Sequence, residues 1–194
     1  FTFDHGCHFK TRKAEYKRSC HESSIRVPTA LQGPGFDGGG YVRELVSIVD
    51  LPPTLLDAAG IPVPEHMQGR SILPLLRHEE VDWPEEVFIQ ISEDQVGRSV
   101  RTQRWKYSVV ARDRDPDRDP DADSYEEEFL YCLETDPYEL TNLIGLESHQ
   151  EVAAVMRHRL LRRMVEVGES APEIKPAPSR PSGQKRVSTA EAHM

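Results

Sequence analysis

The sequence predicts an α/β fold in two parts, followed by a tail without regular structure. Short apolar runs and one helical pattern alternate over residues 1–85, which is typical of an α/β domain. Four β-rich runs and then an amphipathic pattern fill residues 86–168, and they predict a small antiparallel sheet packed by one helix. Residues 169–194 are rich in Pro, Ser, Lys and Glu without a repeating apolar pattern, so we expect a disordered tail.

The first residues predict a polar loop at the end of a strand. Phe1–Phe3 is predicted to be the end of a buried strand, and Asp4–Ser24 an irregular segment at its carboxyl end. Ligand sites cluster at that edge of open α/β sheets. A second short strand is expected over Ile25–Leu31, closed by the glycine-rich turn of residues 33–40.

One helix is expected in the stretch VSIVDLPPTLLDAAGIP. Asp50 is the candidate N-cap, Pro52 and Pro53 lie in the first turn, and Gly60 provides the stop. A shorter helical turn is expected over Ser71–Arg77. The apolar face of the longer helix consists of Val49, Leu51, Leu55, Leu56 and Ala59.

From Glu86 onward the apolar period changes from helical to extended. Glu147–Val167 then returns to helical spacing, and we expect it to pack on the sheet. The four expected strands contain EVFIQIS (residues 86–92), GRSVRTQ (97–103), RWKYSVV (104–110) and EFLYCLE (128–134).

Composition excludes several classes of protein. The 194 residues are 37% hydrophobic, enough for a packed core, and the formal charge of -9 disfavours a nucleic-acid binder that neutralises phosphates. No apolar run approaches the roughly 18 residues of a membrane span. Three widely spread cysteines do not describe a disulfide framework.

Asp4 and His5 are the first candidate site. A carboxylate next to an imidazole at the end of a rigid strand can bind a divalent metal. Taken alone, the pair is better explained as the cap of a loop, and the motifs that follow it reverse that preference.

Two other metal sites can be imagined from the sequence. Cys7-His8 and Cys20-His21 contain zinc-ligating residue types, but their spacing is not that of a zinc finger, and a Cys7–Cys20 disulfide stays open. The aspartate-rich run of residues 112–128 lacks the glycine that an EF-hand needs at its turn, so a solvated loop is expected there.

The order of several short motifs resembles the second half of the sulfatase family, within the alkaline phosphatase superfamily. Asp4-His5-Gly6 is followed by Lys17, then Glu22, then Arg26-Val27-Pro28. Each motif is weak alone, and their order makes the resemblance specific over residues 1–167. Further matching motifs are Val49–Leu56, Ala59–Ile61, Gly69–Leu76, Val100–Thr102, Trp105–Tyr107, Leu130-Tyr131, Asp136-Pro137, Glu139 and Asn142-Leu143.

Some positions depart from the family pattern. Phe3 replaces the usual serine, His21 replaces an aromatic residue, and Cys132 replaces an aspartate. The loop between Gly6 and Lys17 is also short. These departures indicate a subgroup of the family rather than another fold.

The resemblance implies roles for three residues. Asp4 and His5 would be metal ligands, and Lys17 would be a catalytic and substrate-binding residue that contacts the sulfate ester. Calcium is the family's usual metal, and an imidazole donor leaves room for manganese or zinc.

The resemblance also implies a formylglycine nucleophile, which family members make from the Cys or Ser of a Cys/Ser-x-Pro-x-Arg motif. Cys7, Cys20 and Cys132 do not begin this motif, and Ser170 lacks the arginine. Residues 176–180 copy the motif with proline in the nucleophile position. We therefore expect the nucleophile in a preceding region of a longer protein, and we expect this chain alone to be inactive.

The resemblance predicts a sulfuric ester hydrolase acting on a small or carbohydrate sulfate ester, without a nucleic-acid partner. One alternative is a phosphonate monoester or phosphodiester hydrolase of the same superfamily. Another is a non-catalytic binding remnant of the fold. The sequence leaves the compartment and the oligomeric state open.

Overall fold

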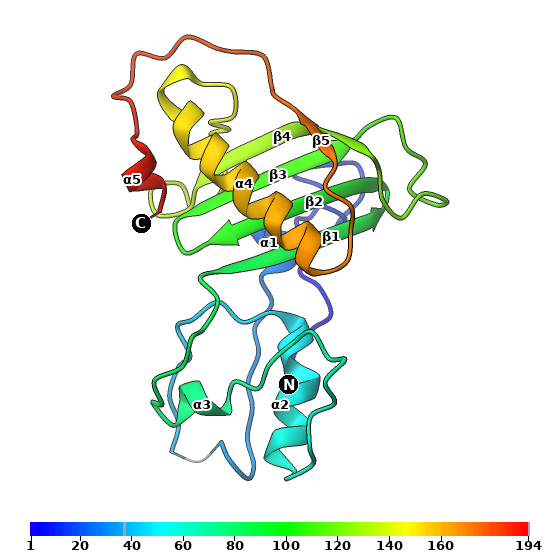
Figure 1. The fold of residues 1–194 in the computed structure, drawn as a ribbon, viewed down its shortest axis with the longest axis vertical. Helices are drawn as coiled ribbons and strands as arrows, with labels where there is room; N and C mark the ends of the chain where they lie inside the picture. Colours follow the sequence, from blue (N-terminus) through cyan, green and yellow to red (C-terminus); the bar gives the residue numbers. More distant parts are fainter. Residues whose placement is uncertain (37, 194) are drawn as a thin grey trace. The chain divides into compact units, whose positions relative to one another are not determined.

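The computed structural model describes residues 1–36 and 38–193. Two compact units can be distinguished in it (Figure 1). Unit 1 contains Phe1–Asp4 and Val27–Val87, and unit 2 contains His5–Arg26 with residues 88–193. The expected boundary near residue 85 falls close to the observed one, but the segment His5–Arg26 groups with the sheet rather than with residues 27–87.

Unit 2 is built on a five-stranded sheet with the strand order β1-β2-β3-β4-β5. The expected four strands are present, and β2, β3 and β4 pair antiparallel. A fifth strand, which the sequence did not predict, pairs parallel with β4. The strands are β1 (Glu86–Glu93), β2 (Gln95–Thr102), β3 (Trp105–Ala111), β4 (Ser124–Cys132) and β5 (Glu173–Lys175).

One face of the sheet packs against α4 (Gln150–Glu166), as Figure 1 shows. The predicted helix over Glu147–Val167 is confirmed, with a short 3-10 turn η2 (Glu147–His149) at its start. Its buried stripe recurs every four residues, because that spacing returns to the same side of a helix. The stripe consists of Val152, Met156, Leu160 and Met164.

The other face of the sheet packs against the segment His5–Arg26. Cys20 is fully buried in a cluster with Phe129, Tyr131 and Leu133. Phe129 and Tyr131 of β4 alternate with Leu130 and Cys132, which belong to the core under α4, so the two clusters lie on opposite faces. The segment also carries the short helix α1 (Glu22–Ile25).

The C-terminal tail differs from its expected disorder. Residues up to 193 include β5 and the short helix α5 (Thr189–Ala192), whereas Met194 lies outside the described residues. The tail contacts the rest of unit 2 through both apolar and polar groups. Ala192 is buried in the core, Ile174, Ala177 and Val187 pack against it, and the Arg180 guanidinium donates to the carbonyl oxygen of Ile144 at 3.1 Å. The sequence did not predict this order because the tail has no repeating apolar pattern. Hydrogen bonds such as those of Arg180 leave no periodic signal in a sequence.

Unit 1 contains the expected helix, α2 (Leu51–Ala58), preceded by the 3-10 turn η1 (Ile48–Asp50). Asp50 lies at the N-cap position, but its carboxylate accepts from the amides of Ser47 and Arg70 instead of capping α2. The expected helical turn is α3 (Leu73–Leu76). The residues expected to form the apolar face of α2 do not form a buried face. Leu55 is 56% exposed, and the buried residues of the helix are Pro53 and Thr54.

Neither strand predicted near the start of the chain forms. Phe1 exchanges two backbone hydrogen bonds with Ala30, both of 2.8 Å, and Thr2 meets Thr29 through their hydroxyls. One such pair is too short for a strand, and Phe1 is 77% exposed instead of buried. Ile25 ends α1, and the residues after it are extended without a ladder. Of the expected turn at 33–40, Asp37 lies outside the described residues.

Candidate active site

The segment His5–Arg26 carries two of the three predicted site residues and folds back on its own helix. The Gly6 amide donates to the carbonyl oxygen of Ser24 at 2.7 Å. A Cβ atom at Gly6 would lie 2.2 Å from the carbonyl oxygen of Ser23, which no side chain allows. Glycine is therefore required here, because the backbone after His5 passes directly against α1.

The imidazole of His5 has a defined tautomer. Its Nδ1 lies 2.7 Å from the carbonyl oxygen of Gly6, and a carbonyl oxygen can only accept, so Nδ1 carries the hydrogen. The lone pair of the neutral ring is then on Nε2. A backbone carbonyl holding one ring nitrogen is a common arrangement behind a histidine that ligates metal through the other.

His5 and Lys17 meet on one aromatic ring. The His5 ring lies edge-on to Tyr16, with ring centroids 6.0 Å apart. The Lys17 ammonium lies 5.8 Å from the centroid of the same ring, within reach of a cation–π interaction. The structure thus brings together two residues that are twelve positions apart in the sequence.

The backbone around Lys17 is fixed by Glu15. Its carboxylate accepts from the amide of Lys17 at 2.8 Å and from the amide of Arg18. Burial acts to raise the pKa of Glu15, but these two amide donors and His8 outweigh it, so the pKa lies below its usual value. Glu15 therefore stays ionised and keeps its hold on the Lys17 backbone at neutral pH.

Asp4 lies at the end of unit 1 and is exposed to solvent. Within the described residues, no group of three or more His, Cys, Asp or Glu side chains is arranged to hold a metal ion. Asp4 and His5 are an oxygen donor and a nitrogen donor of the types that divalent metals use, and the His5 tautomer suits a ligand. Their donor types fit two ligands of a divalent metal, and this role stays a prediction.

The competing metal sites find no support. Cys7, Cys20 and Cys132 are free thiols, so Cys7 and Cys20 form no disulfide. Burial raises the pKa of Cys20 to about 12, which makes it a poor ligand. Two amides of the aspartate-rich loop, those of Asp115 and Asp117, donate to aspartate side chains of the same loop.

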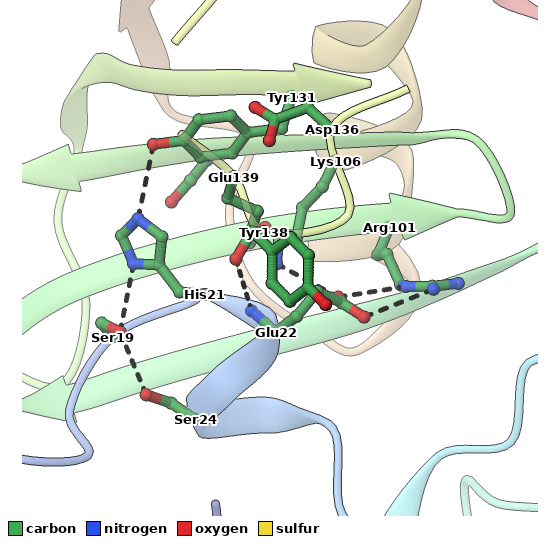
Figure 2. Close-up of polar contacts among 12 residues, drawn as sticks. Ser19, His21, Glu22, Ser24, Arg101, Lys106, Tyr131, Asp136, Tyr138 and Glu139 are labelled. Atoms are coloured by element: carbon green, nitrogen blue, oxygen red, sulfur yellow. Dashed lines mark hydrogen bonds and ion pairs between the residues drawn. The ribbon is translucent and has the colours of Figure 1, made fainter. Parts of the chain in front are cut away.

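The site rests on a charged network whose role sequence reasoning missed (Figure 2). Lys106 and Arg101 contact the carboxylate of Glu22, and Lys106 also contacts Glu139. Burial raises the pKa of Glu139, only partly opposed by Lys106, whereas for Glu22 the two cations outweigh burial and lower the pKa. The sequence did contain a signal for this network: Lys106 is the only charged residue of β3.

A second chain of contacts runs from α1 to β4 through His21. Its Nδ1 lies 3.2 Å from the Ser19 hydroxyl, which in turn lies 3.1 Å from that of Ser24. Its Nε2 lies 3.4 Å from the hydroxyl of Tyr131 (Figure 2). Burial, with the nearby cations of Arg12 and Lys106, lowers the pKa of His21 to about 3. The ring is therefore neutral and has a structural role.

Comparisons with known proteins identify the family of the chain. The family described as "N-sulphoglucosamine sulphohydrolase, C-terminal" matches residues 15–166. Arylsulfatase K from Homo sapiens is 33% identical over 153 residues, which are 74% of this chain and 27% of that protein. The chain therefore spans about a quarter of the length of this relative. No helix within residues 1–36 and 38–193 has the length and apolar character to cross a membrane.

Solved structures give the same result. A 2-O GAG sulfatase superimposes with a TM-score of 0.69 at 27% identity, covering 85% of this chain and 35% of that one. Two more distant structures share the fold over 85% of this chain. One is a protein in complex with its substrate D-glucosamine-2-N,6-O-disulfate (TM-score 0.66, 23% identity, 33% of that chain). The other is a phosphonate monoester hydrolase from Silicibacter pomeroyi (TM-score 0.64, 22% identity, 34% of that chain). The chain belongs to the sulfatase family and corresponds to its C-terminal region.

Proposed function

We propose that this chain is the C-terminal part of a metal-dependent sulfatase that hydrolyses the sulfate esters of sugars. The observation that carries the proposal is that His5 and Lys17 both contact the ring of Tyr16. The family match begins at residue 15, within the same segment. Sulfated sugars are suggested as substrates by the 2-O GAG sulfatase and by the neighbour bound to a disulfated glucosamine.

Lys17 supplies positive charge where the reaction needs it. Cleavage of a sulfate ester gathers negative charge on the sulfuryl oxygens and on the leaving oxygen. A fixed ammonium stabilises that charge more in the transition state than in the ground state, which is how such a group accelerates a reaction. Because Glu15 fixes the backbone of Lys17, less reorganisation is needed when the charge develops.

Asp4 and His5 would hold the divalent metal as two of its ligands. Calcium is our first choice because it is the usual metal of the family, and the nitrogen donor of His5 keeps manganese and zinc as alternatives. When bound, the metal stabilises negative charge on the sulfuryl group. The hydrogen bond from His5 Nδ1 to the carbonyl oxygen of Gly6 orients the ring and leaves Nε2 as the nitrogen for this role.

The nucleophile would come from another part of the full-length protein. The 194 residues contain no Cys/Ser-x-Pro-x-Arg motif from which formylglycine could be made. The expectation that this chain alone is inactive follows from that absence.

The test is turnover by the full-length protein, expressed with the enzyme that makes formylglycine and assayed on p-nitrophenyl sulfate and a sulfated glucosamine. We expect Lys17→Ala to lower kcat/KM by roughly 100-fold or more, the size of effect seen when one charge-stabilising group is removed. Lys10→Ala, an exposed lysine of the same segment, is the matched control and should leave kcat/KM unchanged. Equal losses in the two variants would contradict the role of Lys17.

The same assay separates the second candidate function. The phosphonate monoester hydrolase shares this fold, so a phosphonate monoester should be assayed beside the sulfate ester. A higher kcat/KM on the phosphonate would replace the sulfatase proposal with that activity. Turnover of neither substrate by the metal-loaded, formylglycine-containing protein would favour a non-catalytic binding role.

A further inference from the structure

The charged network defined above is deeply buried. The side chain of Lys106 is fully buried, that of Glu139 is 2% exposed and that of Glu22 is 13% exposed. Lys106 Nζ lies 3.1 Å from Glu22, whose carboxylate Arg101 also contacts at 3.2 Å. Two basic side chains thus face two acidic side chains in a largely buried cluster.

The members of this network come from different parts of unit 2. Arg101 on β2 and Lys106 on β3 are directly opposite each other in the ladder. Glu139 lies in the turn that follows β4, and Glu22 is the first residue of α1. Of these four residues, only Glu22 belongs to the segment that carries Lys17.

Glu139 contacts that segment at two points, one on each side of Lys17. Its carboxylate accepts from the backbone amide of Glu22 at 2.8 Å (Figure 2). Its carbonyl oxygen accepts from the guanidinium of Arg12 at 2.8 Å, and Arg12 also donates to the carbonyl oxygen of Tyr138. Arg12 and Glu22 are each five residues from Lys17, so the two contacts bracket it.

The backbone of Glu139 is held in an uncommon conformation. Its φ of 56° lies in the left-handed region, which non-glycine residues rarely adopt. Such a residue persists only when its surroundings fix it. Here the carboxylate of Asp136 accepts from the amides of Leu140 and Thr141, which sets the turn around Glu139. The turn presents the Glu139 carboxylate inward while Tyr138 stays 76% exposed.

A buried ion network is a poor way to gain stability, because apolar residues of similar size do as well. Such a network can, however, restrict its members to one arrangement. This suits a segment whose backbone position must be kept fixed. We propose that Glu139 is a positioning residue that fixes residues 12–22, and with them Lys17, against the sheet. The catalytic side of this inference rests on the proposed function.

The matched control for Glu139 is Glu127. Its side chain is 3% exposed and forms an ion pair with Arg157 of α4, on the opposite face of the sheet. It also accepts from the hydroxyl of Tyr107 at 3.0 Å. The substitutions Glu139→Gln and Glu127→Gln therefore remove one buried charge each, but only the first touches the segment that carries Lys17.

The first measurement is amide hydrogen exchange on the full-length protein, which does not depend on turnover. We expect Glu139→Gln to increase exchange by about tenfold or more in residues 12–22 while β2, β3 and β4 keep the wild-type rates. Glu127→Gln should leave residues 12–22 unchanged. Unchanged exchange in residues 12–22 of Glu139→Gln, or the same increase in both variants, would overturn the inference.

The second measurement is a double-mutant cycle in the sulfate ester assay. Glu139→Gln should lower kcat/KM by roughly tenfold to 100-fold, because a displacement of about 1 Å can cost that much. In a Lys17→Ala background the same substitution should cost almost nothing, since it acts through Lys17. An equal loss in both backgrounds would show a merely structural role and overturn the coupling. If the wild-type protein does not turn over sulfate esters, the proposed function fails, and the exchange result decides the positioning of residues 12–22 by itself.

Discussion

Unit 2 and residues 27–87 of unit 1 use their apolar residues in opposite ways. In unit 2 every residue of β3 is buried, and the stripe of α4 lies under the sheet. In unit 1, apolar residues of η1 and α2 stay at the surface: Leu55 is 56% exposed and Val49 is 51% exposed. Apolar residues at helical spacing are therefore buried in α4 but exposed around α2.

Half of the buried residues in the described part of unit 1 are polar: Asp50, Thr54 and Glu86 are polar, and Pro53, Ile72 and Leu73 are apolar. Thr54 is fully buried, and its hydroxyl donates to the carbonyl oxygen of Asp50 at 2.6 Å and accepts from the amide of Ile72. The Asp50 carboxylate accepts from two further amides, those of Ser47 and Arg70. Unit 1 thus combines hydrogen bonds around α2 with the buried side chains of Ile72 and Leu73, whereas unit 2 has an apolar cluster on each face of its sheet. The difference shows that a periodic pattern identifies residues suited to burial, but a second surface is needed to bury them.

The largest expected effect is the difference in stability between a substitution in the core of unit 2 and one at an exposed apolar position of unit 1. Trp105 is 1% exposed in the core of unit 2, so Trp105→Ala should lower the free energy of unfolding by about 3–5 kcal/mol. Leu55→Ala on α2 should change it by at most about 0.5 kcal/mol, because the side chain is mostly in water already. Urea unfolding followed by circular dichroism measures both. A loss of several kcal/mol for Leu55→Ala would show that its side chain is covered in solution and would erase the contrast.

The same contrast explains how much of the structure the sequence could predict. The four strands and α4 were predictable because Val100, Tyr107 and Leu160 bury their side chains against partners within the same 100 residues. The strands at Phe1–Phe3 and Ile25–Leu31 were not, because a strand needs a ladder and only Phe1 and Ala30 pair there. Local patterns report propensity, whereas strand formation depends on neighbours.

The candidate site was predictable only in part. The motif order identified Asp4, His5 and Lys17, and the structure brings the last two onto Tyr16. It could not reveal the role of Glu139, since the contacts with Lys106 and Glu22 join residues 33 and 117 positions away and depend on the fold.

A middle-sized effect should appear in the pH dependence of unit 2. The folded pKa of His21 is about 3, below its usual value near 6.5, because burial and the cations of Arg12, Lys106 and Lys13 disfavour its charged form. The unfolded chain therefore binds more protons between these values, and stability should fall as the pH drops from about 6.5 toward 3. One such group contributes a slope of up to about 1.4 kcal/mol per pH unit.

His21→Phe tests this slope, because phenylalanine keeps the packing against Phe129 and Tyr131 without a titrating group. Chemical unfolding at a series of pH values should show a shallower acid slope for the variant than for wild type. His158→Phe, at an exposed position of α4, is the control and should keep the wild-type slope. Identical slopes in His21→Phe and wild type would mean that His21 does not carry the effect.

The smallest expected effect concerns the tail, the part of unit 2 that lacks apolar periodicity. Arg180 donates to the carbonyl oxygens of Asn142 and Ile144, and its own amide donates to Gly145 at 2.7 Å. Arg180→Ala removes only the side-chain bonds, so the free energy of unfolding should fall by about 0.5–1.5 kcal/mol. Limited proteolysis should then cleave residues 181–193 faster, while β2–β4 remain protected. Arg112→Ala, which breaks an exposed ion pair with Glu126, should leave the tail as resistant as in wild type. If the wild-type tail is already cut as fast as the Arg180→Ala tail, the hydrogen bonds of Arg180 do not protect it. The ordered part of unit 2 would then end with α4.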